Sequence, residues 1–174
     1  MASYLNGKSV YLCGPIKMAI KDDGVGWREE ITPRLKKLGI TVLNPCKKTT
    51  AEAAEIGEDK NKFTDVILKE QFGLLKKIFW KIVRTDLRMV DASDFLVFNY
   101  DPDIPTIGSV HELCVANYEK KVVLLKYEKS QLANFNPWIA VFIKEHHFFS
   151  EWDKMFNYLE DVNQGKLDTS LWVI

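Results

Sequence analysis

Residues Arg84–Glu112 read RTDLRMVDASDFLVFNYDPDIPTIGSVHE. The middle of this stretch, Asp94–Tyr100, is rich in aliphatic and aromatic residues and lacks strict alternation, which is typical of a strand that is covered on both faces. A polar loop follows, and Gly108 and Ser109 then open a helix that we expect over Ser109–Tyr118. A buried strand that leads through a loop into a helix predicts one unit of a parallel α/β sheet.

The same character recurs in three further short apolar runs, which we expect to be strands: Ser9–Cys13, Ile40–Leu43 and Lys121–Lys126. Apolar residues at helical spacing lie in three other segments: Asp22–Leu38, Phe63–Val90 and Ser150–Glu160. Gly39 is expected to end the first helix, Gly73 is a candidate break in the second, and Ser150 is expected to cap the third. The terminal residues Leu171–Ile174 predict a last strand or an extended segment.

This alternation of strands and helices predicts an α/β three-layer domain of flavodoxin-like type, with about five mostly parallel strands and right-handed crossovers. The length of 174 residues favours a single domain, residues 1–174. In an open parallel sheet, ligands bind beyond the carboxyl ends of the strands. Gly14-Pro15-Ile16 lies at such an end and lacks the GxGxxG pattern, so a dinucleotide site of that type is disfavoured.

The charge of the chain is balanced: 24 Lys and Arg residues oppose 24 Asp and Glu residues, so the formal net charge is zero. A general nucleic-acid binder usually carries a basic surplus, so the balance argues against that class, although a few basic groups suffice to hold one phosphate. Apolar residues make up 47% of the chain, which is too many for a disordered one. The composition therefore favours a neutral, compact domain and leaves a small-molecule enzyme open.

The cysteines are Cys13, Cys46 and Cys114, an odd number, and no two have the close spacing of a metal site. Reduced thiols in the cytoplasm are the simplest interpretation. No apolar segment of the kind found in signal peptides precedes Val10, and no apolar run approaches the ~18 residues of a membrane helix. We therefore expect a cytoplasmic protein without membrane or nucleic-acid partners.

Glu112 and Asp86 are candidate catalytic groups by their position in the chain. Glu112 is predicted in the first turn of its helix, where the helix dipole favours the ionised form, and an ionised carboxylate at the mouth of a pocket is a usable nucleophile. Asp86 is predicted to end the preceding helix, from which it would approach the same mouth. The alternatives are a capping charge for Glu112 and a solvated helix-end charge for Asp86.

Four segments carry a further pattern: Val10-Tyr-Leu-Cys-Gly-Pro-Ile16, Thr85-Asp-Leu-Arg88, Gly108-Ser-Val-His-Glu-Leu113 and Asn134-Phe-Asn-Pro-Trp138. They resemble, in this order, the Y-[FIL]-x-G run, the D-L segment, the G-[TS]-x-x-E-[IL] turn and the N-x-x-x-W segment of the nucleoside 2-deoxyribosyltransferase family. This family includes virus-encoded members and relatives that hydrolyse 2′-deoxynucleoside 5′-monophosphates. The order of the segments and the spacing between the middle two fit, and the match covers most of the chain.

The resemblance implies catalytic roles for three residues. Glu112 would be the nucleophile that attacks the anomeric carbon of deoxyribose, and Tyr11 would donate a hydrogen bond that orients Glu112. Asp86 would pass a proton to the leaving base and later take one from the acceptor base. Asn134 would reach the 5′ end of the sugar, in this family often across a subunit interface, which implies a homo-oligomer with shared active sites.

The resemblance also implies the reaction. The chain would cleave the N-glycosidic bond of a 2′-deoxynucleoside or its 5′-monophosphate through a covalent deoxyribosyl–Glu112 intermediate and transfer the sugar to another nucleobase. Its partners would be a small-molecule nucleoside or nucleotide and a free nucleobase, with no metal and no organic cofactor. Such chemistry passes through an oxocarbenium-like sugar, which suits one carboxylate that bonds to the sugar and a second that protonates the leaving group.

Thr106 departs from the pattern of the transferases that act on free nucleosides, which usually carry Asp six residues before the nucleophile. The monophosphate hydrolases carry a small hydroxyl residue there, since a negative Asp would repel phosphate. Thr106, Gly108 and Ser109 beside a helix N-terminus would then form a phosphate cradle. Arg84 or Arg88 would add positive charge to it.

Two other residues favour the unphosphorylated substrate. Pro15 stands where the hydrolases have a serine that contacts phosphate, and Asp103 is close enough in the chain to replace the missing Asp. Gly14, which follows the first strand, is expected to contact either substrate. Hydrolysis of a 2′-deoxynucleoside 5′-monophosphate to the free base and deoxyribose 5-phosphate is therefore the enzymatic alternative to transfer.

A non-catalytic nucleotide-sensing or signalling domain is the alternative from another class. Its concrete form, a phospho-acceptor receiver, needs an acidic pair just after the first strand, and Gly14–Lys17 supplies none. His111 neighbours Glu112, but on a helix its side chain would point roughly 100° away, so we expect His111 to be peripheral.

Overall fold

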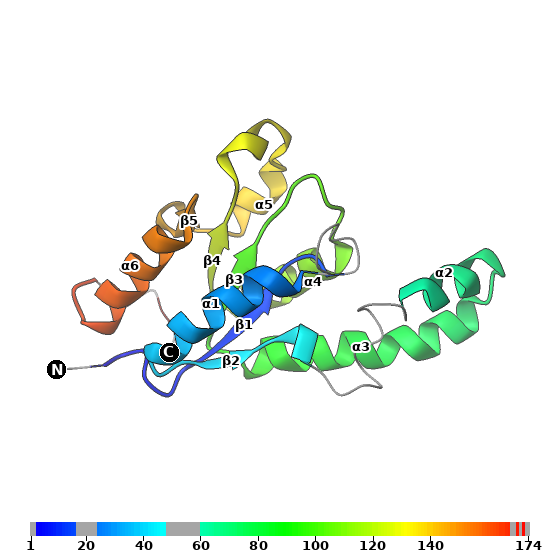
Figure 1. Ribbon diagram of the computed structural model, residues 1–174, viewed down its shortest axis with the longest axis horizontal. Helices are drawn as coiled ribbons and strands as arrows, with labels where there is room; N and C mark the ends of the chain where they lie inside the picture. The colour runs from blue at the N-terminus through cyan, green and yellow to red at the C-terminus, as the bar shows by residue number, and fades with distance from the viewer. Residues whose placement is uncertain (1–2, 17–23, 48–59, 168–169, 171, 173–174) are drawn as a thin grey trace.

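A computed structural model describes residues 3–16, 24–47, 60–167, 170 and 172 of the chain (Figure 1). Its centre is a five-stranded parallel sheet with the strand order β2-β1-β3-β4-β5. The strands are β1 (Ser9–Cys13), β2 (Thr41–Leu43), β3 (Phe95–Asn99), β4 (Val122–Lys126) and β5 (Phe148–Phe149). This order reverses once, between β1 and β3, as in flavodoxin-like sheets. The predicted fold class is confirmed.

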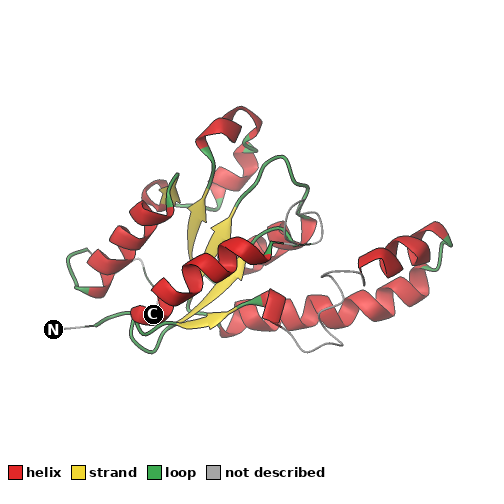
Figure 2. Cartoon of the chain, viewed as in Figure 1, coloured by secondary structure: helices red, strands yellow, loops and turns green. Residues whose placement is uncertain are grey.

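Helices cover both faces of the sheet and complete the three layers (Figure 2). One face packs against α1 (Val25–Lys37) and α6 (Trp152–Asn163). The other face packs against α3 (Phe72–Ala92), α4 (Ile107–Tyr118) and α5 (Pro137–Val141). The short helices η1 (Pro45–Lys47), η3 (Lys129–Asn134) and η4 (Glu145–His147) lie in the connections. No helix in the described part of the chain has the length and apolar character needed to cross a membrane.

The central strand β1 serves both layers because successive side chains of a strand point to opposite faces. Val10 and Leu12 belong to the core beneath α1 and α6, whereas Tyr11 and Cys13 belong to the core beneath α3 and α4. All four residues are buried, which is why the run shows no polar alternation in the sequence. The strand therefore directs Tyr11 and Cys13 toward the helix that carries Glu112.

The long apolar pattern forms two helices, and the break between them differs from the predicted one. Helix α2 spans Lys60–Leu68, and the chain turns before α3 begins at Phe72. Glu70 adopts a left-handed backbone conformation (φ 52°) there, and the amide of Gln71 donates to the Val66 carbonyl. Gly73 lies inside the first turn of α3, where one glycine costs only about 1 kcal/mol and does not end a helix.

Helix α3 continues beyond the edge of the sheet, and α2 lies along this outer part (Figure 1). The ring centroids of Phe63 from α2 and Phe79 from α3 are 4.6 Å apart. This packing fixes the outer half of α3, whose inner half faces α4 and β1.

The C-terminal region differs from the prediction in two places. Glu151, not Ser150, occupies the N-cap position of α6, and its side chain makes no capping hydrogen bond. The edge position beside β4 is taken by β5, a strand that was not predicted, whereas a last strand or an extended segment was expected at Leu171–Ile174. Most of that segment lies outside the described residues, but Trp172 is buried with its ring centroid 5.1 Å from that of Phe95.

Candidate active site

A cavity of about 420 Å³ opens at the carboxyl ends of β1 and β3, the edge at which ligands were predicted to bind. This volume lies within the usual range of small-molecule sites. Its walls come from the turn after β1, the middle of α3 and the start of α4. Six of the predicted site residues line it: Gly14, Asp86, Thr106, Gly108, Ser109 and Glu112.

The Glu112 carboxylate receives a hydrogen bond on each of its two oxygens. The Tyr11 hydroxyl donates to Oε1 over 2.9 Å, as the resemblance implies. The Cys13 thiol donates to Oε2 over 3.1 Å. Both donors come from β1, where residues two apart share a face of the sheet. The carboxylate is therefore attached to the rigid central strand at both oxygens.

The electrostatic expectation for Glu112 was wrong. Helix α4 begins at Ile107 with Thr106 as its N-cap, so Glu112 is the sixth residue of the helix and lies beyond the first turn, where the dipole effect is concentrated. Burial, and next the negative charge of Asp86, raise the pKa of Glu112 from 4.5 to about 7. The Cys13 and Tyr11 hydrogen bonds and the positive charge of Arg28 act in the opposite direction.

Asp86 lies within α3, six residues before the helix ends at Ala92, and does not end the helix as predicted. The buried stripe of α3 contains Ile82, Asp86 and Val90, spaced four residues apart. Asp86 is only 7% exposed, and it lines the cavity with Glu112. A buried carboxylate on a helix stripe of otherwise apolar residues faces the site and not solvent. The alternative that Asp86 is a solvated charge at a helix end is therefore excluded.

The donors to Glu112 retain their protons. Burial, followed by the charges of Glu112 and Asp86, raises the pKa of Tyr11 well above its ordinary value. Burial, followed by the charge of Glu112, likewise raises the pKa of the Cys13 thiol. Both groups are therefore neutral at physiological pH and act as donors to the carboxylate.

Arg28 supports the wall of the cavity and was not identified from the sequence. Its guanidinium is fully buried and donates to the carbonyl oxygens of Leu12 (3.2 Å) and Gly14 (2.9 Å), and also to those of Pro15 and Gly24. The spacing along the helix could have indicated that Arg28 is buried, because Arg28 lies three and seven residues before the buried Ile31 and Leu35.

Gly14 is required by the close packing of the turn after β1. Its φ of +154° lies in a region that L-residues with a side chain rarely adopt. A Cβ atom there would lie 2.9 Å from the Asn99 carbonyl oxygen and 3.1 Å from the Trp27 ring. Glycine therefore lets β1 and β3 approach each other closely at the floor of the cavity.

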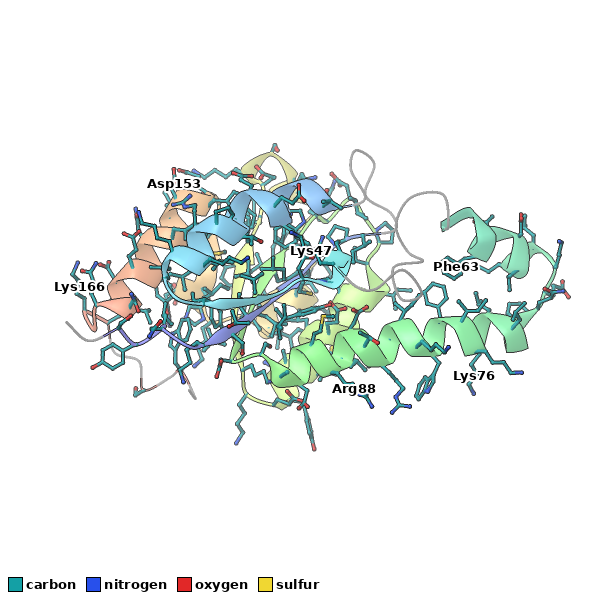
Figure 3. All side chains as sticks on the ribbon, turned by 60° about the horizontal axis from the view of Figure 1, so that its bottom comes forward. Lys47, Phe63, Lys76, Arg88, Asp153 and Lys166 are labelled. Carbon is teal, nitrogen blue, oxygen red and sulfur yellow. The ribbon has the colours of Figure 1, made fainter. Side chains whose placement is uncertain are left out.

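Arg84 and Arg88 do not line the cavity. Both are exposed on α3, and two residues along a helix turn a side chain by roughly 200°, so each lies opposite to Asp86. Figure 3 shows Arg88 on the side of α3 that points away from the sheet. The expectation that one of these arginines adds positive charge to a phosphate site is therefore wrong for this conformation of the chain.

Asp103 and Asn134 are brought together but also lie outside the cavity. The Asn134 amide donates to Asp103 Oδ1 over 2.7 Å, and the Gln131 amide donates to Asp103 Oδ2 over 3.0 Å. Both predicted residues are exposed. The homo-oligomer in which Asn134 would reach a neighbouring active site stays a prediction.

His111 lines the cavity, contrary to the expectation that it is peripheral. It is exposed, and residues before and after it on α4, among them Ser109 and Glu112, also line the cavity. Within the described residues, no group of three or more His, Cys, Asp or Glu side chains is arranged to hold a metal ion.

The fold and the cavity together define an α/β protein with two carboxylates at the switch point of a flavodoxin-like sheet. Among solved structures, one that shares this fold is the 2-deoxyribosyltransferase from the psychrotolerant bacterium Bacillus psychrosaccharolyticus, with a TM-score of 0.56 and 17% identity over 86% of this chain and 91% of that chain. Another is a conserved protein from Enterococcus faecalis V583, with a TM-score of 0.58 and 18% identity over 91% of this chain and 98% of that chain. At these identities the likeness shows the fold alone. No protein-family model and no curated protein matches the chain.

The raised pKa of Glu112 predicts a pH-dependent effect on stability. Between the ordinary pKa of 4.5 and about 7, the folded state keeps a proton that the unfolded state has released, so this group's contribution to the free energy of unfolding falls as pH rises through that window. Glu112→Gln removes the effect. We expect the thermal unfolding midpoint of the variant, relative to the unsubstituted protein, to be higher at about pH 8 than at about pH 5.

The matched control is Glu29→Gln, because Glu29 is an exposed carboxylate on α1. The difference in thermal unfolding midpoint between this control and the unsubstituted protein should be the same at both pH values. An equal difference at both pH values for Glu112→Gln would contradict the raised pKa.

Proposed function

We propose that this chain is an enzyme that cleaves the N-glycosidic bond of a 2′-deoxynucleoside through a covalent deoxyribosyl–Glu112 intermediate and transfers the sugar to another nucleobase. The observation that carries the proposal is the Glu112 carboxylate, which Tyr11 and Cys13 hold in a cavity that Asp86 also lines. The fold shared with a 2-deoxyribosyltransferase supports it.

In the first half of the proposed reaction, a Glu112 carboxylate oxygen bonds to the anomeric carbon, and the bond from that carbon to the base nitrogen breaks. The electron pair of the broken bond goes to the base, and Asp86, which enters this step protonated while Glu112 is ionised, donates the proton that makes the base a better leaving group. The product is an ester of deoxyribose with Glu112. Two carboxylates with these roles are the arrangement of retaining glycosidases.

In the second half, a nitrogen of the acceptor base attacks the anomeric carbon, the ester bond to Glu112 breaks, and Asp86 takes the proton of the acceptor. The ester must survive until the acceptor arrives, which requires that water be limited. The part of α3 that lines the cavity supplies apolar side chains for this purpose, among them Phe79, Ile82, Val83 and Leu87.

The charge of the cavity favours a neutral nucleoside over a 5′-monophosphate. Its described lining contains two carboxylates and neither lysine nor arginine, and Arg84 and Arg88 lie on the opposite face of α3. A phosphate dianion would be repelled by Asp86 and an ionised Glu112.

One observation favours the second candidate function, hydrolysis of a 2′-deoxynucleoside 5′-monophosphate. Thr106, Gly108 and Ser109 line the cavity at the N-terminus of α4, where backbone amides and the helix dipole attract anions. The two candidate functions therefore differ in one electrostatic balance. The hydrolase requires that the attraction of these amides for phosphate exceed the repulsion by the two carboxylates.

The test is to incubate the protein with 2′-deoxynucleosides or their 5′-monophosphates, with and without a second free base, and to separate the products by chromatography. We expect a new nucleoside from the unphosphorylated substrate, and a kcat/KM at least about tenfold lower for the monophosphate, because one unfavourable charge contact costs this much or more. Release of deoxyribose 5-phosphate as the main product would favour the hydrolase. No base release from any substrate would contradict the proposal and favour a nucleotide-sensing domain.

A further inference from the structure

We propose that Cys13 is a positioning residue for Glu112: its buried thiol donates to Oε2 and, together with Tyr11 on Oε1, holds the carboxylate in one orientation. The Cys13 Sγ atom lies 3.1 Å from Oε2 and 3.5 Å from the Ser109 carbonyl oxygen, and the residue is fully buried. The catalytic meaning of this inference rests on the proposed function, whereas the hydrogen bond is a property of the fold.

The position of Cys13 in the sheet makes its donor rigid. Cys13 pairs with Phe98 of β3, and Tyr11 pairs with Leu96 of β3 and Leu43 of β2. The two donors are therefore fixed relative to each other by a strand that has neighbours on both sides. A carboxylate bound through both oxygens to such a strand resists rotation about its terminal bond. A nucleophile needs this kind of restraint, because small misplacements cost much of the rate.

A thiol suits this position because it is a weak hydrogen-bond donor. A strong donor stabilises the negative charge of a carboxylate and so reduces the electron density available for attack on carbon. Cys13 restrains Oε2 with a donor that is weaker than a hydroxyl. A hydroxyl at this position would hold the carboxylate more firmly and make it a weaker base.

Charged and titratable groups face Glu112 from three other elements, and a test must take them into account. Tyr11 faces it from β1, Asp86 from α3 and Arg28 from α1, and the effect of each on the pKa of Glu112 is given above. His111 is its neighbour on α4 itself. None of these groups changes in a Cys13 variant, so a shift of the Glu112 titration in that variant reports the thiol.

The test is the titration of the Glu112 carboxyl carbon by NMR in the full chain labelled with ¹³C-glutamate, with the resonance assigned by its loss in Glu112→Gln. We expect Cys13→Ala to raise the titration midpoint by about half to one pH unit, because one hydrogen bond to the charged form is lost. Cys13→Ser retains a donor of greater strength, so we expect its midpoint to fall below that of the unsubstituted protein. Cys114→Ala removes an exposed thiol and should leave the midpoint unchanged.

A residue that only fills space would not move the midpoint, so an unchanged midpoint in both Cys13 variants overturns the inference. Cys13→Ser keeps the size of the side chain and decides the question alone if Cys13→Ala fails to fold. The pH profile of kcat for base release provides a second readout, and its acid limb should shift by the same amount in each variant. If the unsubstituted protein releases no base, the proposed function fails, while the NMR titration still decides the role of Cys13.

Discussion

Glu112→Gln is expected to slow release of the base by at least about a thousandfold, the scale on which removal of a covalent nucleophile acts. The amide has nearly the same shape as the carboxylate but does not form a stable bond to the anomeric carbon. Base release is measured in a single turnover with excess protein. Intact-protein mass spectrometry provides a direct second measurement, because the unsubstituted protein, incubated with a deoxynucleoside without an acceptor base, should gain the mass of a deoxyribosyl group.

Glu29→Gln is the matched control for this experiment as well. It removes a carboxylate from the exposed face of α1 and should release the base at the full rate. A cooperative unfolding transition in Glu112→Gln shows that the loss of rate is not a loss of the fold. Full activity in this variant, or a deoxyribosyl adduct on another residue, would mean that Glu112 is not the nucleophile.

Asp86→Asn is expected to slow base release by about a hundredfold to ten-thousandfold, the range attributed to general acid catalysis. The size of the loss should depend on the leaving base, because Asp86 acts by protonating it. A nucleoside whose base leaves readily without a proton should lose much less rate than a natural one. The measurement is kcat for both kinds of substrate in the variant and in the unsubstituted protein.

Asp91→Asn is the matched control, since Asp91 is an exposed aspartate on the same helix. It should leave both rates unchanged. An equal loss in Asp86→Asn on the two kinds of substrate would show that Asp86 holds the site together and does not donate the proton.

The fold could be predicted because its central strands are covered on both sides. Runs such as Ser9–Cys13 and Asp94–Tyr100 are apolar at nearly every position, a pattern that few other structures require. The predicted boundaries differ from the observed ones by at most one residue for these two strands. The break between α2 and α3 could not be predicted, since it depends on a left-handed Glu70 and not on the glycine nearby.

The site could be predicted only in part. Glu112 and Asp86 were candidates by their position in the chain, whereas Tyr11 was a candidate only because its segment resembles one of the nucleoside 2-deoxyribosyltransferase family. Arg28 was missed because its partners are backbone carbonyls of the turn after β1, and its spacing from Ile31 and Leu35 indicates only that it lies on the buried face of α1. Cys13 was interpreted as an ordinary thiol, although its spacing of two from Tyr11 placed it on the same face of the strand.

The amino-acid sequence by itself determined the fold class, the central strands, the edge of the sheet at which the cavity lies and the candidate nucleophile. These features follow from hydrophobic periodicity and local motifs, which act over a few residues. Only the tertiary structure decided which charges face the cavity, because that depends on how α3 and α4 are rotated against the sheet. This rotation buries Asp86 beside Glu112 and leaves Arg84 and Arg88 exposed, so a chain with no net charge has a cavity whose described wall is acidic.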